Sequence, residues 1–286
     1  MEGRYKMDFK SIPEVDDEKV EKIIDYFMDK KDFTLEELTE AVDSCSVVDT
    51  VSKNNSKALT IFYSGDGNDI INTLSAQTGD SIRVIRRTER FKLLAYNKDG
   101  KSFEELVKMA IKADDRYKCD VTSEEFEAAF NEIMYGVSEA NTPVDVVGKG
   151  FWSKCSSDFA KETTGDVYAL ISNANETRIF SRDELKQIIN AIPDDKEICG
   201  FTKDKFQGMN TQEIFELLKE KVREDMKDTI VYLDDKGYKI GQKLTITINK
   251  EKTILSDYVN DVIPSEYAYE MTSSRYCDLS DLKWLK

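Results

Sequence analysis

The second half of the sequence limits the fold most tightly, because apolar strands alternate there with amphipathic helices. The predicted strands are 166–172, 196–202 and 229–235, and the predicted helices are 150–163, 182–192 and 210–226. Alternation of this kind is typical of a parallel sheet, in which each helix connects one strand to the next. Ligands of such folds bind at the carboxyl ends of the strands, so we expect a functional site there.

The first part of the chain predicts a helical lobe. Residues 17–30 form an amphipathic helix, and residues 34–45 follow as a second helix that Thr34 and Glu37 open with a capping box. The apolar face of the first helix comprises Val20, Ile23, Ile24 and Phe27. Two short helices therefore precede the first strand.

The middle of the chain mixes strands and helices. A first strand is predicted at 58–63 and a shorter strand or sheet edge at 81–88, with a helix at 68–78 between them. Two further helices begin at capping boxes that Ser102 and Thr122 open.

These elements together predict an α/β fold in three parts. Residues 1–56 form a helical N-terminal segment, and residues 57–236 form the α/β domain with its parallel sheet. Residues 237–286 form an appended C-terminal β and irregular element, which begins with an alternating strand, KLTITIN.

The composition excludes several classes of function. The net charge of −15 opposes binding to nucleic acids and to anionic membranes. The chain has no histidine, which excludes Ser-His-Asp and Cys-His catalysis and all His-ligated zinc sites. Any catalyst must therefore use carboxylates, hydroxyls, thiols, lysines or tyrosines.

The cysteines and the N-terminal residues indicate in which cellular compartment the protein acts. The five cysteines are odd in number and widely spaced, so we expect reduced thiols and no disulfide framework. No apolar run reaches the length of a membrane span, and no hydrophobic signal region opens the chain. We expect a cytoplasmic protein, or one that is delivered into a target cell without a cleavable signal peptide.

Residues 62–71, FYSGDGNDII, combine two glycines with acidic and amide side chains after the first strand. The stretch is similar to one unit of the calcium-binding β-roll repeats, but those sites need stacked copies. It also lacks the GK[ST] of a P-loop. We interpret it as a tight turn at Gly65 and Gly67, and we expect no metal. Tyr63 and Ser64 stand at the end of the strand, where ligands bind.

The most specific pattern is FWSKCSSDFAKETTGDVYALISNANETRIFSRDEL, residues 151–185. It resembles the ADP-ribosyl cyclase and NAD glycohydrolase family, whose bacterial toxin members lack disulfides. That family has a helix beginning Trp-x-x-x-Ser-x-x-Phe-Ala, then a buried strand, and a catalytic glutamate four residues after a pocket aromatic. The matching residues are Trp152, Ser156, Phe159, Ala160, Phe180 and Glu184.

The resemblance extends over about residues 57–235 and implies cleavage of the nicotinamide–ribose bond of NAD or NADP, with no cofactor beyond that substrate. It implies that Glu184 is the catalytic residue. The implied substrate-binding residues are Trp152, Tyr63, Ser64, Arg86, Ser156 and Phe180. Tyr63 replaces a family tryptophan and Arg86 replaces an acid, so we expect hydrolysis rather than cyclisation. A toxin or effector of this kind would meet an immunity, activating or host protein partner.

The implied chemistry suits a chain without histidine. Nicotinamide leaves as a neutral molecule, so the reaction needs a carboxylate beside the ribosyl cation rather than a general acid. The pyrophosphate needs local cations in an acidic chain. The candidates are Arg83, Arg86, Arg87, Arg90, Lys92 and Lys154.

Each of these residues also has a purely structural interpretation. Glu184 completes a Ser181-x-x-Glu184 capping box, Trp152 and Phe180 suit a core, and Ser156 suits a helix face. The arginines could simply offset the acidic surface. For the whole chain, the alternative is a catalytically inactive cyclase-like protein that binds a nucleotide or a host or partner protein.

Overall fold

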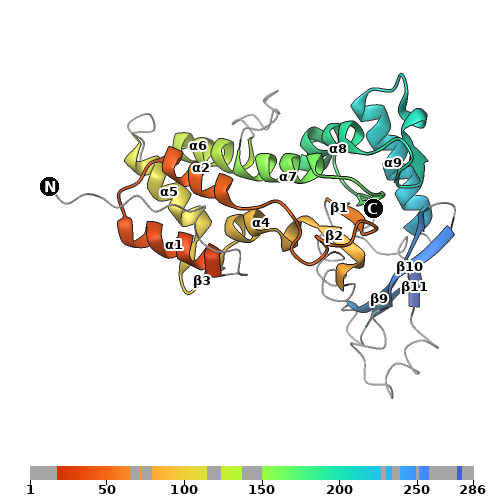
Figure 1. Cartoon of the computed structure of the whole chain (residues 1–286), viewed down its shortest axis with the longest axis horizontal. Coiled ribbons are helices and arrows are strands. Elements are labelled where there is room, and N and C mark those ends of the chain that lie inside the picture. Colours follow the sequence, from red (N-terminus) through yellow and green to blue (C-terminus); the bar gives the residue numbers. More distant parts are fainter. Residues whose placement is uncertain are drawn as a thin grey trace, which may run out of the picture. The chain divides into compact units, whose positions relative to one another are not determined.

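A computed structural model describes most of the chain. The described residues are 18–64, 71, 79–114, 124–136 and 150–226, together with the strands 230–233, 239–248, 251–257 and 276–278. The chain divides into two compact units, each built from two separate parts of the sequence (Figure 1). Unit 1 comprises Met1–Thr50 and Ile85–Glu162, and unit 2 comprises Val51–Val84 and Thr163–Lys286.

Unit 1 is a helical unit. Its elements are α1 (Glu18–Lys30), α2 (Leu35–Ser44), η3 (Ile85–Arg87), α4 (Glu89–Leu94), β3 (Asn97–Lys98), β4 (Lys101–Ser102), α5 (Phe103–Ala113), α6 (Glu124–Tyr135) and α7 (Phe151–Lys161). The predicted apolar face of α1 is confirmed, because all four of its residues are buried. The rings of Phe103 and Phe151 meet edge to face, with their centroids 5.3 Å apart, which joins α5 to α7.

The predicted caps of unit 1 are confirmed where the structure describes them. The Thr34 hydroxyl accepts a hydrogen bond from the N–H of Glu37, and the Glu37 carboxylate accepts one from the N–H of Thr34. Ser102 caps α5 in the same way by accepting from the N–H of Glu105. Both caps satisfy N–H groups that a helix leaves without partners at its first turn. Thr122 lies outside the described residues.

Unit 2 contains the predicted parallel sheet. Its described strands lie in the order β2-β1-β5-β6-β7, with β1 (Leu59–Tyr63), β2 (Ile82–Val84), β5 (Val167–Leu170), β6 (Glu197–Ile198) and β7 (Phe201–Thr202). Neighbouring strands from β2 to β6 are parallel, and β7 is antiparallel to β6. The α/β class is therefore correct.

The predicted single strand 196–202 is a hairpin instead. Cys199 and Gly200 have positive φ angles of 49° and 82°, and they turn the chain between β6 and β7. A positive φ cannot continue a strand, which explains why one apolar run gives two short strands.

Unit 2 also contains five described helical elements. They are η2 (Gly79–Ser81), η5 (Phe180–Glu184), α8 (Leu185–Ala191), η6 (Lys203–Phe206) and α9 (Thr211–Met226). Of these, α9 packs against β5 and η6 against β7. The Tyr168 hydroxyl on β5 donates a 3.2 Å hydrogen bond to the Asp225 carboxylate on α9, and Lys221 pairs with the same carboxylate. Burial raises the pKa of Tyr168, so this hydroxyl stays a hydrogen-bond donor. The contact ties α9 to the centre of the sheet.

The prediction that strand 229–235 joins the parallel sheet was wrong. This segment, β8 (Ile230–Leu233), belongs to a second, antiparallel sheet with the order β10-β9-β8-β11. The other strands are β9 (Lys239–Ile248), β10 (Glu251–Asp257) and β11 (Tyr276–Asp278). Strands that are close in sequence pair antiparallel without a crossover helix, and β8 and β9 do so.

The two units do not follow the predicted boundaries. α1 and α2 pack against α4 and α5, so they are part of unit 1 rather than a separate segment 1–56. The boundary at residue 236 would separate β8 from β9, which are paired neighbours. The predicted helix 68–78, except the helical Ile71, lies outside the described residues.

Candidate functional site

The residues that the sequence predicts for the site divide between the two units. Arg86, Trp152 and Ser156 belong to unit 1, and Tyr63, Ser64, Phe180 and Glu184 belong to unit 2.

Glu184 is buried in a short π-helical segment. Its residue is 5% exposed, and it ends η5, a single π-helical turn that continues directly into α8. Such turns are rare and are frequent at functional sites. The predicted Ser181-x-x-Glu184 capping box was wrong, because no side-chain cap forms at η5 or α8. Ile179 already has helical φ and ψ angles of −51° and −41°, so Ser181 lies inside the helix and not at its N-terminus.

Aromatic packing holds this turn against the parallel sheet. Phe180 is 1% exposed, and its ring centroid lies 6.0 Å from that of Phe62 on β1 and 6.4 Å from that of Phe215 on α9. The turn also contains a second buried carboxylate, Asp183, to which Arg182 donates hydrogen bonds of 2.9 Å from Nε and 2.6 Å from Nη2. The Glu184 side chain is therefore largely shielded from solvent.

Tyr63 and Ser64 lie at the carboxyl end of β1, as predicted. The N–H of Ser64 donates a 3.0 Å hydrogen bond to the carbonyl of Leu170, which extends the parallel pairing of β1 and β5 by one residue. Side chains alternate between the faces of a strand, so Ser64 lies on the face that carries Phe62, while Tyr63 lies on the opposite face. Because Phe62 contacts Phe180, Ser64 is on the side of the sheet that η5 covers.

In unit 1, Trp152 packs against an aromatic neighbour. Its ring meets that of Phe91 edge to face, at 5.1 Å between centroids and an angle of 69°. The Arg86 guanidinium lies 5.8 Å from the centroid of the same Phe91 ring, within the range of a cation–π contact. Trp152 is half-buried and Ser156, one turn further along α7, is buried. These contacts fit the structural interpretation, and the substrate roles of the three residues stay predictions.

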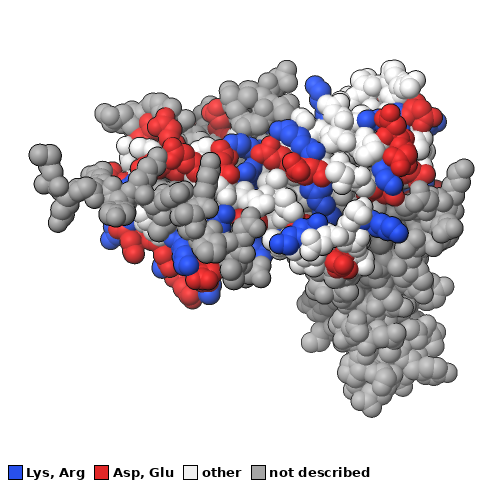
Figure 2. Space-filling view, in the orientation of Figure 1, with Lys and Arg blue, Asp and Glu red and all other residues white. Residues whose placement is uncertain are grey.

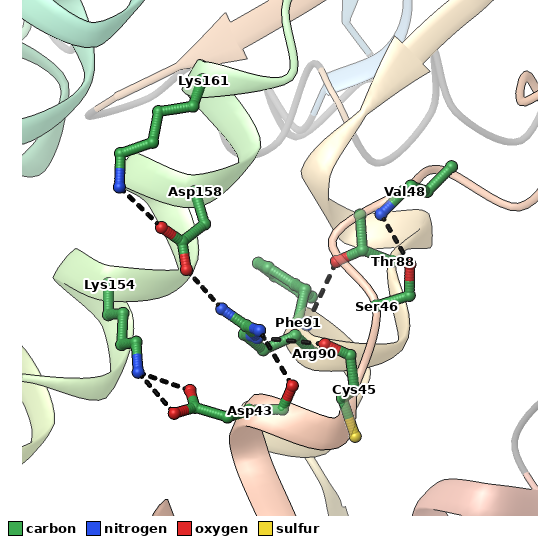
Figure 3. A network of polar contacts seen from close by, with 10 residues as sticks. All are labelled: Asp43, Cys45, Ser46, Val48, Thr88, Arg90, Phe91, Lys154, Asp158 and Lys161. Carbon is green, nitrogen blue, oxygen red and sulfur yellow. Dashed lines mark hydrogen bonds and ion pairs between the residues drawn. The ribbon is translucent and has the colours of Figure 1, made fainter. Parts of the chain in front are cut away.

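Two of the predicted phosphate-binding cations, Arg90 and Lys154, instead join helices of unit 1 (Figure 3). Nη1 of the buried Arg90 on α4 donates to the Asp158 carboxylate on α7 at 2.7 Å, and its Nε donates to the Cys45 carbonyl after α2 at 3.2 Å. Nζ of Lys154 donates to both carboxylate oxygens of Asp43, at 2.5 and 2.6 Å. The alternative that the arginines offset acidic side chains therefore applies to Arg90, and Lys154 is likewise paired with an acidic side chain.

The surface agrees with this interpretation. On the face shown in Figure 2, the Lys and Arg side chains of the described residues are interspersed with Asp and Glu side chains. Arg87 is paired with an acidic side chain as well, because its Nη1 lies 3.8 Å from a carboxylate oxygen of the buried Asp49.

The described thiols are buried and poorly suited to catalysis. Cys45, Cys155 and Cys199 are buried thiols that form no disulfide, as the sequence predicts for reduced cysteines. Burial raises the pKa of Cys45 to about 11 and that of Cys199 to about 12. A thiol attacks as its thiolate, so neither is a nucleophile near neutral pH. Within the described ranges, no group of three or more acidic or cysteine side chains is arranged to hold a metal ion.

Unit 2 also contains a pocket that no sequence motif indicates. It has a volume of about 430 Å³ and lies where α8, η6 and the start of α9 meet. Its lining residues are Lys186, Ile189, Asn190, Lys203, Phe206, Gln207, Met209, Asn210, Thr211 and Ile214. They come from α8 and from the stretch 203–214, which contains η6, the start of α9 and the connection between them, so the pocket depends on how these two parts of the chain pack together.

Comparisons with known proteins give no relative: no family model, no curated protein and no solved structure matches the chain. Among the helices that the structure describes, none combines the length and apolar character needed to cross a membrane.

Proposed function

We propose that the chain is an NAD glycohydrolase that releases nicotinamide from NAD or NADP, with Glu184 as the catalytic carboxylate. The observation that carries the proposal is the burial of Glu184 in a π-helical turn packed on a parallel sheet. The choice of NAD or NADP as substrate and of nicotinamide release as the reaction rests on the resemblance in residues 151–185.

The chemistry requires one anion in a dry environment. As the bond between C1′ and the nicotinamide nitrogen breaks, its electron pair neutralises the pyridinium, and positive charge develops on the ribose. Water then adds to C1′ and loses a proton, which gives ADP-ribose. A carboxylate beside that developing cation stabilises the transition state more strongly when water is excluded, because the effective dielectric constant is lower.

The other residues have supporting roles in the proposal. Ser64 contacts the ribose, because it lies on the face of β1 that η5 covers. Phe180 fixes the turn that carries Glu184 and, together with Phe62 and Phe215, gives this turn apolar surroundings. The resemblance also implies contacts of Trp152 and Tyr63 with nicotinamide and of Arg86 and Ser156 with the ribose or the phosphates. These four roles stay predictions, because Tyr63 lies on the other face of β1 from Ser64 and the other three residues belong to unit 1.

The test is incubation of the full chain with NAD, and separately with NADP, followed by chromatographic measurement of nicotinamide and ADP-ribose. We expect release by the wild-type chain and its loss in Glu184→Gln. The matched control is Asp183→Asn, which removes the neighbouring buried carboxylate and should keep the rate per folded molecule. Saturable nucleotide binding without release by the wild-type chain would instead support the inactive, binding-only alternative.

A further inference from the structure

The residues that line the pocket between α8, η6 and α9 indicate which class of ligand the pocket binds. Its volume of about 430 Å³ lies within the range of small-molecule sites. The apolar part of the lining is formed by Ile189, Phe206, Met209 and Ile214. The polar part consists of Lys186, Asn190, Lys203, Gln207, Asn210 and Thr211. No carboxylate is among the lining residues, although the chain carries a net charge of −15.

Both lysines of the lining can accept an anion. Within the described part of the chain, no ion pair involves Lys186, which is exposed. Lys203 has one ionic contact, at 3.3 Å from an Asp194 carboxylate whose side chain is 92% exposed. An ion pair that is so open to solvent contributes little, so a ligand can displace it at a small cost.

Amide side chains line the same pocket as the two lysines. The Asn210 side-chain oxygen accepts a 3.0 Å hydrogen bond from the N–H of Glu213, so the amide nitrogen of Asn210 is the group left to donate to a ligand. Asn190 and Gln207 carry further amides in the lining. The lining therefore offers two positive charges, neutral donors and an apolar surface within one pocket.

We propose that this pocket binds a phosphate monoester with an aromatic or other apolar body. The phosphate dianion matches the charge of Lys186 and Lys203, and the apolar body covers Phe206 and Ile214. Phosphate groups favour such charge-assisted hydrogen bonds from ammonium and amide donors.

This site is distinct from the proposed catalytic residue. Glu184 is buried and is not among the lining residues, whereas Lys186 on the same helix is exposed and lines the pocket. Glu184 and Lys186 are two residues apart in the sequence. Two residues correspond to about 200° around a helix axis, so their side chains point in nearly opposite directions. The inference therefore goes beyond NAD cleavage and does not depend on it.

The test is calorimetric titration of the full chain with phenyl phosphate as the probe. We expect saturable binding that weakens at least about tenfold in Lys186→Gln/Lys203→Gln, equivalent to about 1.4 kcal/mol. Lys205→Gln, which changes an exposed lysine of η6 outside the lining, is the matched control and should bind as the wild type does. Glu184→Gln should also keep its affinity, which separates this proposal from the catalytic one.

Three comparison ligands and a salt titration complete the experiment. Phenol lacks the phosphate, inorganic phosphate lacks the ring and benzoate has a single charge, so each should bind more weakly than phenyl phosphate. Added salt should weaken the binding of phenyl phosphate to the wild-type chain, because the interaction is electrostatic. The proposal is overturned by absent binding to the wild-type chain, by equal affinity in the double lysine variant, or by phenol binding as well as phenyl phosphate.

Discussion

At the scale of single residues, Arg90 shows how an acidic chain uses its cations. Its guanidinium is buried and donates to the Asp158 carboxylate and to the carbonyls of Cys45 and Asp43, at 2.7, 3.2 and 3.4 Å (Figure 3). These contacts join the end of α2, α4 and α7. A buried charge is favourable only when its donors are satisfied, and here each nitrogen has a partner.

Replacing Arg90 should therefore destabilise unit 1. We predict that Arg90→Ala lowers the free energy of unfolding by about 3 kcal/mol, because Asp158 Oδ2 and the carbonyls of Cys45 and Asp43 lose the donor that Arg90 supplies. The matched control is Lys161→Ala, which removes the other cation of Asp158. That lysine side chain is 53% exposed, so its loss should cost less than about 1 kcal/mol. Urea denaturation measures both values, and equal effects would contradict the assignment.

Asp158 should also give unit 1 an acid-sensitive contribution to stability. Burial raises the pKa of this carboxyl, but the hydrogen bonds from Lys161 and Arg90 outweigh burial, so the pKa is lowered. Since the folded pKa lies below the unfolded one, the unfolded chain takes up the proton first as the pH falls. The stabilisation is present above about pH 4 and is lost as the pH falls through the folded pKa.

Denaturation at several pH values measures this effect. The difference in unfolding free energy between the wild type and Asp158→Asn should be constant near neutral pH and shrink below about pH 4. A difference that stayed constant into acid, or grew there, would show that the ion pairs do not lower this pKa.

Only part of the residue-level site could be predicted. The position of Ser64 at the end of β1 follows from local strand periodicity, which the sequence carries. The π-helical turn of Glu184 does not, because it depends on Phe180 packing between Phe62 and Phe215, which come from distant elements. The same holds for Lys186 and Lys203, which tertiary folding brings into one pocket.

At the scale of elements, local signals set the helix starts of unit 1. Thr34 and Glu37 exchange both hydrogen bonds of a capping box, and Ser102 caps α5 with a hydroxyl. These motifs act within one turn, so the sequence was enough to place α2 and α5. The hairpin of β6 and β7 was missed because the positive φ of Cys199 is not a typical property of cysteine.

The cap of α2 gives a direct test at this scale. We predict that Thr34→Ala lowers the unfolding free energy by about 1 kcal/mol, because the N–H of Glu37 loses its acceptor. Thr34→Ser keeps the hydroxyl and should stay within about 0.5 kcal/mol of the wild type. Thermal or urea unfolding distinguishes the two variants, and identical losses would rule out the capping hydrogen bond as the cause.

At the scale of the whole molecule, each unit combines segments that are far apart in the sequence. Unit 1 takes its helices from both sides of the strands β1 and β2, which belong to unit 2. The sequence predicted most of these elements but placed the boundaries at residues 56 and 236. Boundaries depend on which elements pack together, and local periodicity does not report packing.

Truncation of the chain tests whether the domain boundary lies at residue 236, between β8 and β9, or before the whole antiparallel sheet. β8 pairs with β9 on one side and with β11 on the other, so a chain ending at residue 236 keeps β8 without either neighbour. We predict that this truncation aggregates more than one ending at residue 226, which removes the whole antiparallel sheet. An unpaired apolar strand exposes backbone groups that pair with other chains. Light scattering measures the difference, and equal aggregation would contradict the observed pairing.

The most direct test of the central claim compares nicotinamide release from NAD by the wild-type chain and by Glu184→Gln, at equal folded fraction by circular dichroism. The substitution keeps the size of the side chain and removes its charge. We expect the rate to fall at least about a hundredfold, because an anion no longer faces the ribosyl cation. A wild-type chain that releases no nicotinamide, or a variant that releases it at the wild-type rate, would contradict the account.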